Sequence, residues 1–191
     1  MKKVTFLLAA ILVLGVSNFA KAQNNGDGRS ANHDVKVGIS KHSLVGVSST
    51  STIVLEPAAP TVAGEGLDFD VQSATDNSVW LQYSSIIGGN ANNISVSMAG
   101  DALPTGVYIE LTAANDAGKG KGQVGNSHGR KIKLSNSPQE FISEIRNCYT
   151  GTGSNAGHQL TYTLKVESNV NYQNLSSGDF TNTITYTITA N

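Results

Sequence analysis

The last stretch of the chain constrains the fold more than any other part of the sequence. From residue 183 to residue 190, threonine alternates with a larger or apolar side chain. Ile184, Tyr186 and Ile188 therefore lie at every second position. Successive side chains leave opposite faces of a β-strand, so this pattern predicts a strand with one buried face. The strand is long, regular and low in charge, and such a strand at a sheet edge invites pairing with another chain. We therefore expect it either to lie centrally in its own domain, which is the position we predict, or to join subunits.

Alternating or apolar runs recur along the rest of the chain, separated by glycine, proline and polar residues. We expect about nine short strands, at residues 34–39, 44–56, 67–72, 79–83, 94–98, 107–112, 131–135, 160–167 and 180–190. Short strands spaced roughly 8 to 14 residues apart predict an all-β, antiparallel β-sandwich of the immunoglobulin-like or pilin-like kind. A closed barrel is the alternative.

One short helix is predicted near residues 138–147. Ser137 is suited to the N-cap, Pro138 to the first turn and Glu140 to the closing position of a capping box. Apolar residues follow at 141, 142 and 145, which lie on one face of a helix. A stretch rich in glycine, residues 115–129, is expected to be a loop.

The N-terminus has the features of a secretory signal peptide. Lys2 and Lys3 precede an apolar run at residues 5–16, and Ala20-Lys21-Ala22 fits the cleavage rule for small residues. The apolar run is shorter than the roughly 20 residues that span a bilayer. We expect a signal peptide at residues 1–22, a flexible leader at 23–32 and a single domain at 33–191, exported to the periplasm, the cell surface or the medium, with no membrane span after cleavage.

Charge and cysteine content narrow the classes of function. Three of the thirteen basic residues lie in the signal peptide, which leaves ten against fourteen acidic residues. An acidic exported chain is not expected to bind nucleic acid. Cys148 is the only cysteine, so no disulfide forms within the chain. We expect a small buried apolar side chain there, with pairing between chains as the alternative.

Three short patterns match enzyme or nucleotide motifs. Residues 125–129 fit the serine hydrolase elbow with Ser127 as nucleophile, whereas residues 120–125 and 151–156 fit dinucleotide-binding glycine patterns. The elbow needs a strand-to-helix turn, and the glycine patterns need a strand before them and a helix after them. None has that setting, so we interpret these stretches as loops that use glycine for positive φ. No cofactor and no enzyme activity are expected.

The candidate binding residues fall into three groups. Trp80 and Tyr83 are candidates for an aromatic sugar-stacking platform, although core packing explains them as well. A local group of cations is a candidate for contact with an anionic glycan or lipid headgroup, and a solvated hairpin end is its alternative; the group comprises Lys119, Lys121, His128, Arg130, Lys131 and Lys133. Asp68, Asp70 and Asp76 are minor candidates for Ca²⁺, and a solvent-facing strand edge is the simpler interpretation.

The chain end resembles that of a known class of surface proteins. Gly178-Asp179-Phe180 followed by Ile184-x-Tyr186-Thr187-Ile188 is similar to the closing strand of pilin-like and spore-coat-protein-U-like secreted sandwiches of Gram-negative bacteria. Residues 148–151 (CYTG), followed by 160–162 (LTY), resemble the same proteins. The resemblance implies a structural or adhesion role. Those families usually carry a disulfide, which this chain lacks, and residues 23–32 do not match the apolar segment with which classical pilins complete a neighbour's sheet.

Together these features predict a non-enzymatic, exported cell-surface structural or adhesion module, with a fibre or pilus-like subunit as one form of it. Its partners would be copies of itself, other surface subunits or glycans. A carbohydrate-binding module is the alternative, and a serine hydrolase acting through Ser127 is a remote one.

Overall fold

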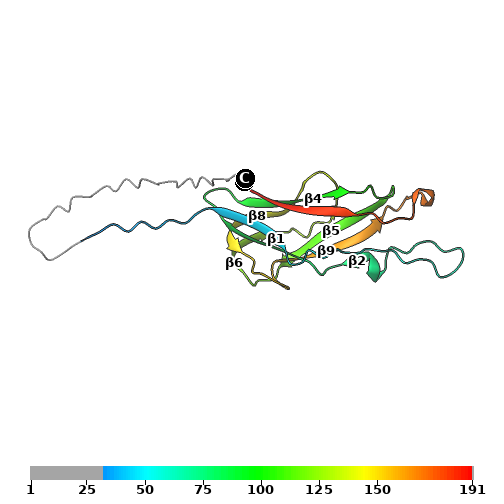
Figure 1. Cartoon of the computed structure of the whole chain (residues 1–191), viewed down its shortest axis with the longest axis horizontal. Coiled ribbons are helices and arrows are strands. Elements are labelled where there is room, and N and C mark those ends of the chain that lie inside the picture. The colour runs from blue at the N-terminus through cyan, green and yellow to red at the C-terminus, as the bar shows by residue number, and fades with distance from the viewer. Residues whose placement is uncertain (1–31, 191) are drawn as a thin grey trace, which may run out of the picture. The chain divides into compact units, whose positions relative to one another are not determined.

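The computed structural model describes residues 32–190 (Figure 1). The predicted signal peptide and nearly all of the predicted leader lie outside the described residues. Contacts divide the chain into two units, Met1–Gly38 and Ile39–Asn191. The described residues of the first unit, 32–38, have no regular secondary structure. No helix in the described part of the chain has the length and apolar character to cross a membrane.

The second unit is built almost entirely of β-strands, which confirms the predicted fold class. Its strands are β1 His42–Val47, β2 Thr75–Asp76, β3 Trp80–Ile86, β4 Asn92–Gly100, β5 Val107–Asp116, β6 Lys121–Asn126, β7 Ile132–Lys133, β8 Gln139–Tyr149, β9 His158–Val166 and β10 Asn182–Ala190. Two 3₁₀ turns, Gln72–Ala74 and Tyr172–Asn174, complete the regular structure. Every ladder is antiparallel.

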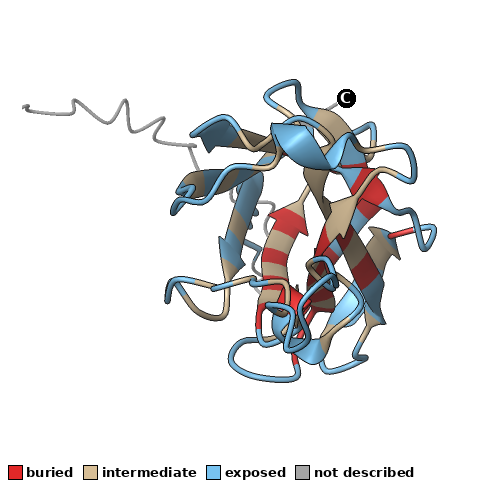
Figure 2. Cartoon of the chain, turned by 90° about the vertical axis from the view of Figure 1, so that its right-hand side faces the viewer, coloured by how far each residue is buried: buried red, intermediate tan, exposed pale blue. Residues whose placement is uncertain are grey.

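The ten strands form one hydrogen-bonded sheet that is folded in a sandwich-like way. The main order is β10-β4-β8-β3-β9-β5-β7, with β1 on β3, β2 on β9 and β6 on β8. Strand β3 joins the two halves, because Ser84 and Ser85 pair with β8 while Trp80 and Leu81 pair with β9. The inner faces of both halves contribute to a single apolar cluster, and Figure 2 shows the buried bands on the central strands and the exposed loops around them.

Strand β8 replaces the predicted helix at 138–147, so that prediction is wrong. Gln139–Tyr149 is paired with β4 along its first half and with β6 along its second half. Glu144 has a φ of +59° within this strand, and the registers with both neighbours shift nearby. This irregularity lets Phe141, Ile142 and Ile145 all become buried, although strict alternation would turn Ile142 outward. Pairing on both sides outweighs a local capping signal, which is a weak determinant by comparison.

Other boundaries also differ from the sequence predictions. Residues 34–39 and 51–56 form no strand, and residues 67–72 contribute only an isolated bridge between Asp68 and Ala58. Ile53 and Leu55 nonetheless pack half-buried against the core. The stretch predicted to be a long loop, residues 115–129, contains β6.

Strand β10 has the predicted faces but not the predicted position. Ile184, Tyr186 and Ile188 pack against the core, while the intervening threonines are exposed. Among the described strands, however, β10 pairs only with β4, from Asn182 opposite Gly100 to Ala190 opposite Asn92. The predicted central position is therefore wrong, because β10 is an edge strand.

Candidate functional site

The free edge of β10 is the most distinctive surface of the sheet. All nine residues of the strand are paired with β4 on one side, and among the described strands no ladder forms on the other side, although β1 lies close to β10. The inward row of Ile184, Tyr186 and Ile188 is only partly buried. Native edge strands are usually interrupted by charge, proline or a bulge, whereas residues 182–190 contain neither a charge nor a proline.

The inward row is held rigidly at its centre. The hydroxyl groups of Tyr186 and Tyr162 lie 2.8 Å apart, and the Tyr186 ring is 6.1 Å from that of Phe141. Burial raises the pKa of the Tyr186 hydroxyl above its ordinary value, so this hydroxyl remains protonated and able to donate at neutral pH. Tyr186 therefore anchors the centre of β10 to Tyr162 of β9 and Phe141 of β8.

A second exposed apolar feature lies at residues 34–39, which we call the N-terminal segment. Val35, Val37 and Ile39 are 75%, 82% and 81% exposed. They alternate with Asp34, Lys36 and Gly38, so an extended backbone would place all three aliphatic side chains on one face. Three aliphatic side chains so exposed and so regularly spaced are typical of a surface that meets a partner.

The predicted aromatic platform is not assembled in the structure. Tyr83 is 5% exposed, its hydroxyl lies 2.8 Å from His158 Nε2 and contacts the Val124 carbonyl, and its ring stacks on that of His158. Trp80 lies on the opposite, partly exposed face of β3. The two side chains therefore do not share a surface on which a sugar ring could stack.

Four of the six predicted cationic residues fall into two separate pairs. Lys121 is opposite Tyr149 near the end of β8, and Lys119 Nζ lies 3.4 Å from the Ser154 carbonyl. Arg130 and Lys131 form ion pairs of 3.3 Å with Glu140 and Glu110 respectively. Glu140 and Tyr149 are nine residues apart on one strand, or about 30 Å at roughly 3.3 Å per residue. The four cations do not converge on one ligand.

The hydrolase pattern lacks an exposed nucleophile. Ser127 is 2% exposed, and its hydroxyl has no hydrogen-bond partner among the described residues. His128 Nε2 instead lies 2.8 Å from Ser143 Oγ. The predicted use of glycine for positive φ is confirmed, because Gly125 and Gly153 have φ of +77° and +82°. The prediction of a loop at residues 120–125 is wrong, however, because Gly125 lies in strand β6.

The aspartates considered for Ca²⁺ do not form a cluster. Asp70 forms an ion pair of 3.1 Å with Lys165, and Asp76 Oδ1 accepts a hydrogen bond from the Ser78 amide. Within residues 32–190, no three His, Cys, Asp or Glu side chains gather in an arrangement suited to a metal ion.

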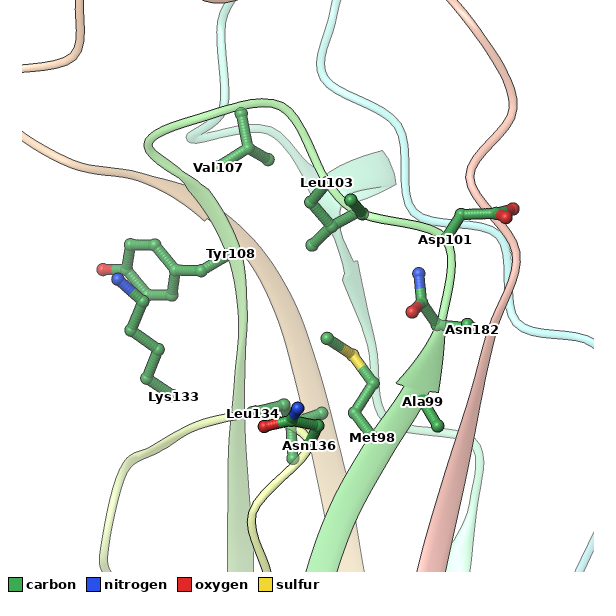
Figure 3. Close-up of a pocket in the computed structure, with 12 residues that line it drawn as sticks. Met98, Ala99, Asp101, Leu103, Val107, Tyr108, Lys133, Leu134, Asn136 and Asn182 are labelled. Carbon is green, nitrogen blue, oxygen red and sulfur yellow. The ribbon is translucent and has the colours of Figure 1, made fainter.

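A shallow recess of about 260 Å³ lies at the end of β4 and the start of β5 (Figure 3). Leu103, Met98 and Val107 give it an apolar lining, and Asn182 Nδ2 at the start of β10 is buried without a partner among the described residues. Lys133 lies 4.5 Å from the Tyr108 ring centroid at its rim and is paired with Glu167. Sequence patterns marked Lys133 as a candidate binding residue but did not indicate this recess, because its lining residues come together only through folding.

Comparisons with known proteins add no family: no family model, no curated protein and no solved structure matches the chain. The geometry of the described residues is therefore the basis for a functional assignment.

Proposed function

We propose that this chain is a non-enzymatic, exported surface subunit that assembles by strand addition, in which the N-terminal segment of one copy pairs with the free edge of β10 in another. The single observation that carries the proposal is the unpaired, uncharged edge of β10 in a chain that also presents an unpaired apolar segment. Export is supported by the signal-peptide features of residues 1–22, and a structural role by the resemblance of the chain end to secreted surface sandwiches.

The two surfaces match in length and charge. Six residues of extended chain cover about 20 Å, and the nine residues of β10 cover about 30 Å, so the segment fits within the edge. Asp34 and Lys36 cancel in charge, and β10 carries none. Main-chain hydrogen bonds would supply affinity, as in other cases of strand addition, and alternate side chains would supply specificity.

The apolar side chains also match. An added strand whose Val35, Val37 and Ile39 point inward would lie beside the half-buried row of β10. Fully burying an aliphatic side chain contributes about 1.5–3 kcal/mol, so three contribute on the order of 5–9 kcal/mol. Association costs at least about 4 kcal/mol, which leaves a net gain only if most of this burial is realised.

The matched test compares two exposed valines. Val37→Asp places a charge where an inward aliphatic side chain is required, whereas Val62→Asp alters a valine that is 59% exposed and outside both surfaces. Light scattering on chains beginning at Gln23 should show assemblies for the parent and for Val62→Asp, and monomers for Val37→Asp. At concentrations low enough to keep the parent monomeric, thermal unfolding should be unchanged in both variants.

A monomeric parent over the whole accessible concentration range would rule out self-assembly. Assemblies that persist in Val37→Asp would show that another surface joins the subunits. A synthetic peptide of residues 33–40 should also dissolve parent assemblies, whereas a peptide of the same composition without the alternation should not.

A further inference from the structure

A second recess, of about 360 Å³, lies where β1 and β4 begin and β3 ends. Its volume is within the range of small-molecule sites. It is lined by the start of β1 (Lys41, His42 and Ser43), by the loop after β3 (residues 86–90) and by Asn92. Sequence patterns gave no indication of this site.

Asn92 is the unusual residue of this recess, because it is 1% exposed and only one of the two polar atoms of its amide forms hydrogen bonds. Its Nδ2 lies 2.6 Å from Ser43 Oγ and 3.1 Å from Ser85 Oγ. Its Oδ1 is buried and has no hydrogen-bond partner among the described residues. A buried polar atom without a partner costs about 1–3 kcal/mol, and a ligand group that pairs with it would recover part of that cost.

The chemistry of the missing partner follows from the two serines. A serine hydroxyl either donates or accepts, so both orientations of the Asn92 amide satisfy the serines and leave the opposite amide atom unpaired. A ligand hydroxyl also donates or accepts, and it is therefore suited to either orientation. The recess is matched to a hydroxyl-bearing ligand.

A cation is held at the mouth of the same recess. The side chain of Lys41 lies directly against Gly88, so that a Cβ added at Gly88 would be 2.2 Å from Lys41 Cε. No carboxylate forms an ion pair with Lys41 among residues 32–190. Arg146 Nη1 lies 3.5 Å from the Gly89 carbonyl and adds positive charge behind the loop. An anionic group on the ligand would meet Lys41.

We infer that this recess binds an acidic saccharide unit, with a sugar hydroxyl on the Asn92 amide and the sugar carboxylate on Lys41. None of the lining residues belongs to the N-terminal segment or to β10, although Asn92 pairs with Ala190 at the end of β10. A surface subunit with this site would contact an acidic glycan whether or not it assembles.

The test is calorimetric titration of the chain beginning at Gln23 with galacturonic acid, tri-galacturonate and the neutral trisaccharide maltotriose. We expect saturable binding of an acidic sugar and at least tenfold weaker binding of maltotriose. Binding of tri-galacturonate alone assigns a polymeric glycan as the source of the ligand, and equal binding of the monosaccharide assigns the free acid. Equal binding of maltotriose, or no binding of either acidic sugar, would overturn the inference.

Two pairs of variants locate the binding. Lys41→Gln removes the cation, and Gly88→Ala displaces the lysine chain; each should weaken binding of the acidic sugar about tenfold or more. Their controls are Lys131→Gln, at an exposed lysine elsewhere, and Gly46→Ala, at a glycine outside the recess where an added Cβ meets nothing within 4 Å. Unchanged affinity in both Lys41→Gln and Gly88→Ala would contradict this site, and light scattering on the same samples reports separately on assembly.

Discussion

Gly157→Ala should destabilise the fold more than any other single glycine substitution in its loop. Gly157 is buried directly before β9, with a φ of +84°. An added Cβ would lie 2.1 Å from the Leu81 carbonyl oxygen, and Leu81 is paired with His158 at the junction of β3 and β9. Left-handed backbone costs a non-glycine residue about 1–2 kcal/mol, and forced displacement of packed structure adds about 1–3 kcal/mol. We expect a total near 3 kcal/mol.

Gly153→Ala is the matched control in the same loop. Gly153 has a φ of +82°, but an added Cβ there meets nothing within 4 Å. Gly153→Ala should therefore lose only the stability that the left-handed backbone costs a non-glycine residue, about 1–2 kcal/mol. At about 2–4 °C per kcal/mol for a domain of this size, Gly157→Ala should lower the Tm by roughly 6–12 °C, and Gly153→Ala by clearly less, in thermal unfolding followed by circular dichroism. Equal losses would refute the close approach of the two backbones.

Three further outcomes are expected. Ile184→Asp should lower the free energy of unfolding by several kcal/mol, because it puts a charge on the inward face of β10. Thr185→Asp, on the exposed face, should change it by no more than about 0.5 kcal/mol. Equal losses of stability in chemical denaturation would mean that both faces are buried. Burial, with a smaller effect of Asp116, raises the pKa of the Cys148 thiol from 9.0 to about 11. Folding therefore favours the protonated thiol. Its contribution to the free energy of unfolding is fully present below pH 9 and is lost as the pH rises toward 11. Between pH 9 and pH 11 the Tm should fall more steeply in the parent than in Cys148→Ala. Intact-mass measurement of exported protein should place the N-terminus at or near Gln23, and a retained Met1 would contradict cleavage.

Sequence patterns located most strands because apolar residues recur at every second position wherever one face of a strand is buried. The strands predicted at 94–98 and 107–112 lie within β4 and β5, and those predicted at 79–83, 160–167 and 180–190 overlap β3, β9 and β10. In the strand predicted at 131–135, the alternate apolar residues Ile132 and Leu134 are buried, at 6% and 5% exposure. Cys148 is likewise a small buried side chain, as predicted.

The errors arose where long-range pairing decides the outcome. A capping box at residues 137–140 indicated a helix, yet partners on both sides of β8 and an irregularity at Glu144 made it a strand. The alternation of residues 34–39 indicated a strand, yet a strand also needs a partner, and the chain supplies none among its described residues. The position of β10 at the edge depends on the whole sheet order, which no local pattern contains.

Site prediction from sequence had little success for a related reason. Residue types singled out Trp80, Tyr83 and a cationic group that folding does not bring to one surface. Asn92 and Lys41, in contrast, are ordinary residues in the sequence, and only the structure shows that a buried amide with an unpaired oxygen and a lysine without an ion pair among the described residues line the same recess.

The most direct test of assembly is hydrogen exchange at the amides of β10, measured at low and at high protein concentration. Alternate amides of an edge strand face away from the neighbouring strand and should exchange rapidly in monomers. If the N-terminal segment of another copy pairs with this edge, those amides should become protected as concentration rises, together with the amides of residues 34–39, and Val37→Asp should abolish the protection. Assemblies that form while both sets of amides remain unprotected would contradict strand addition.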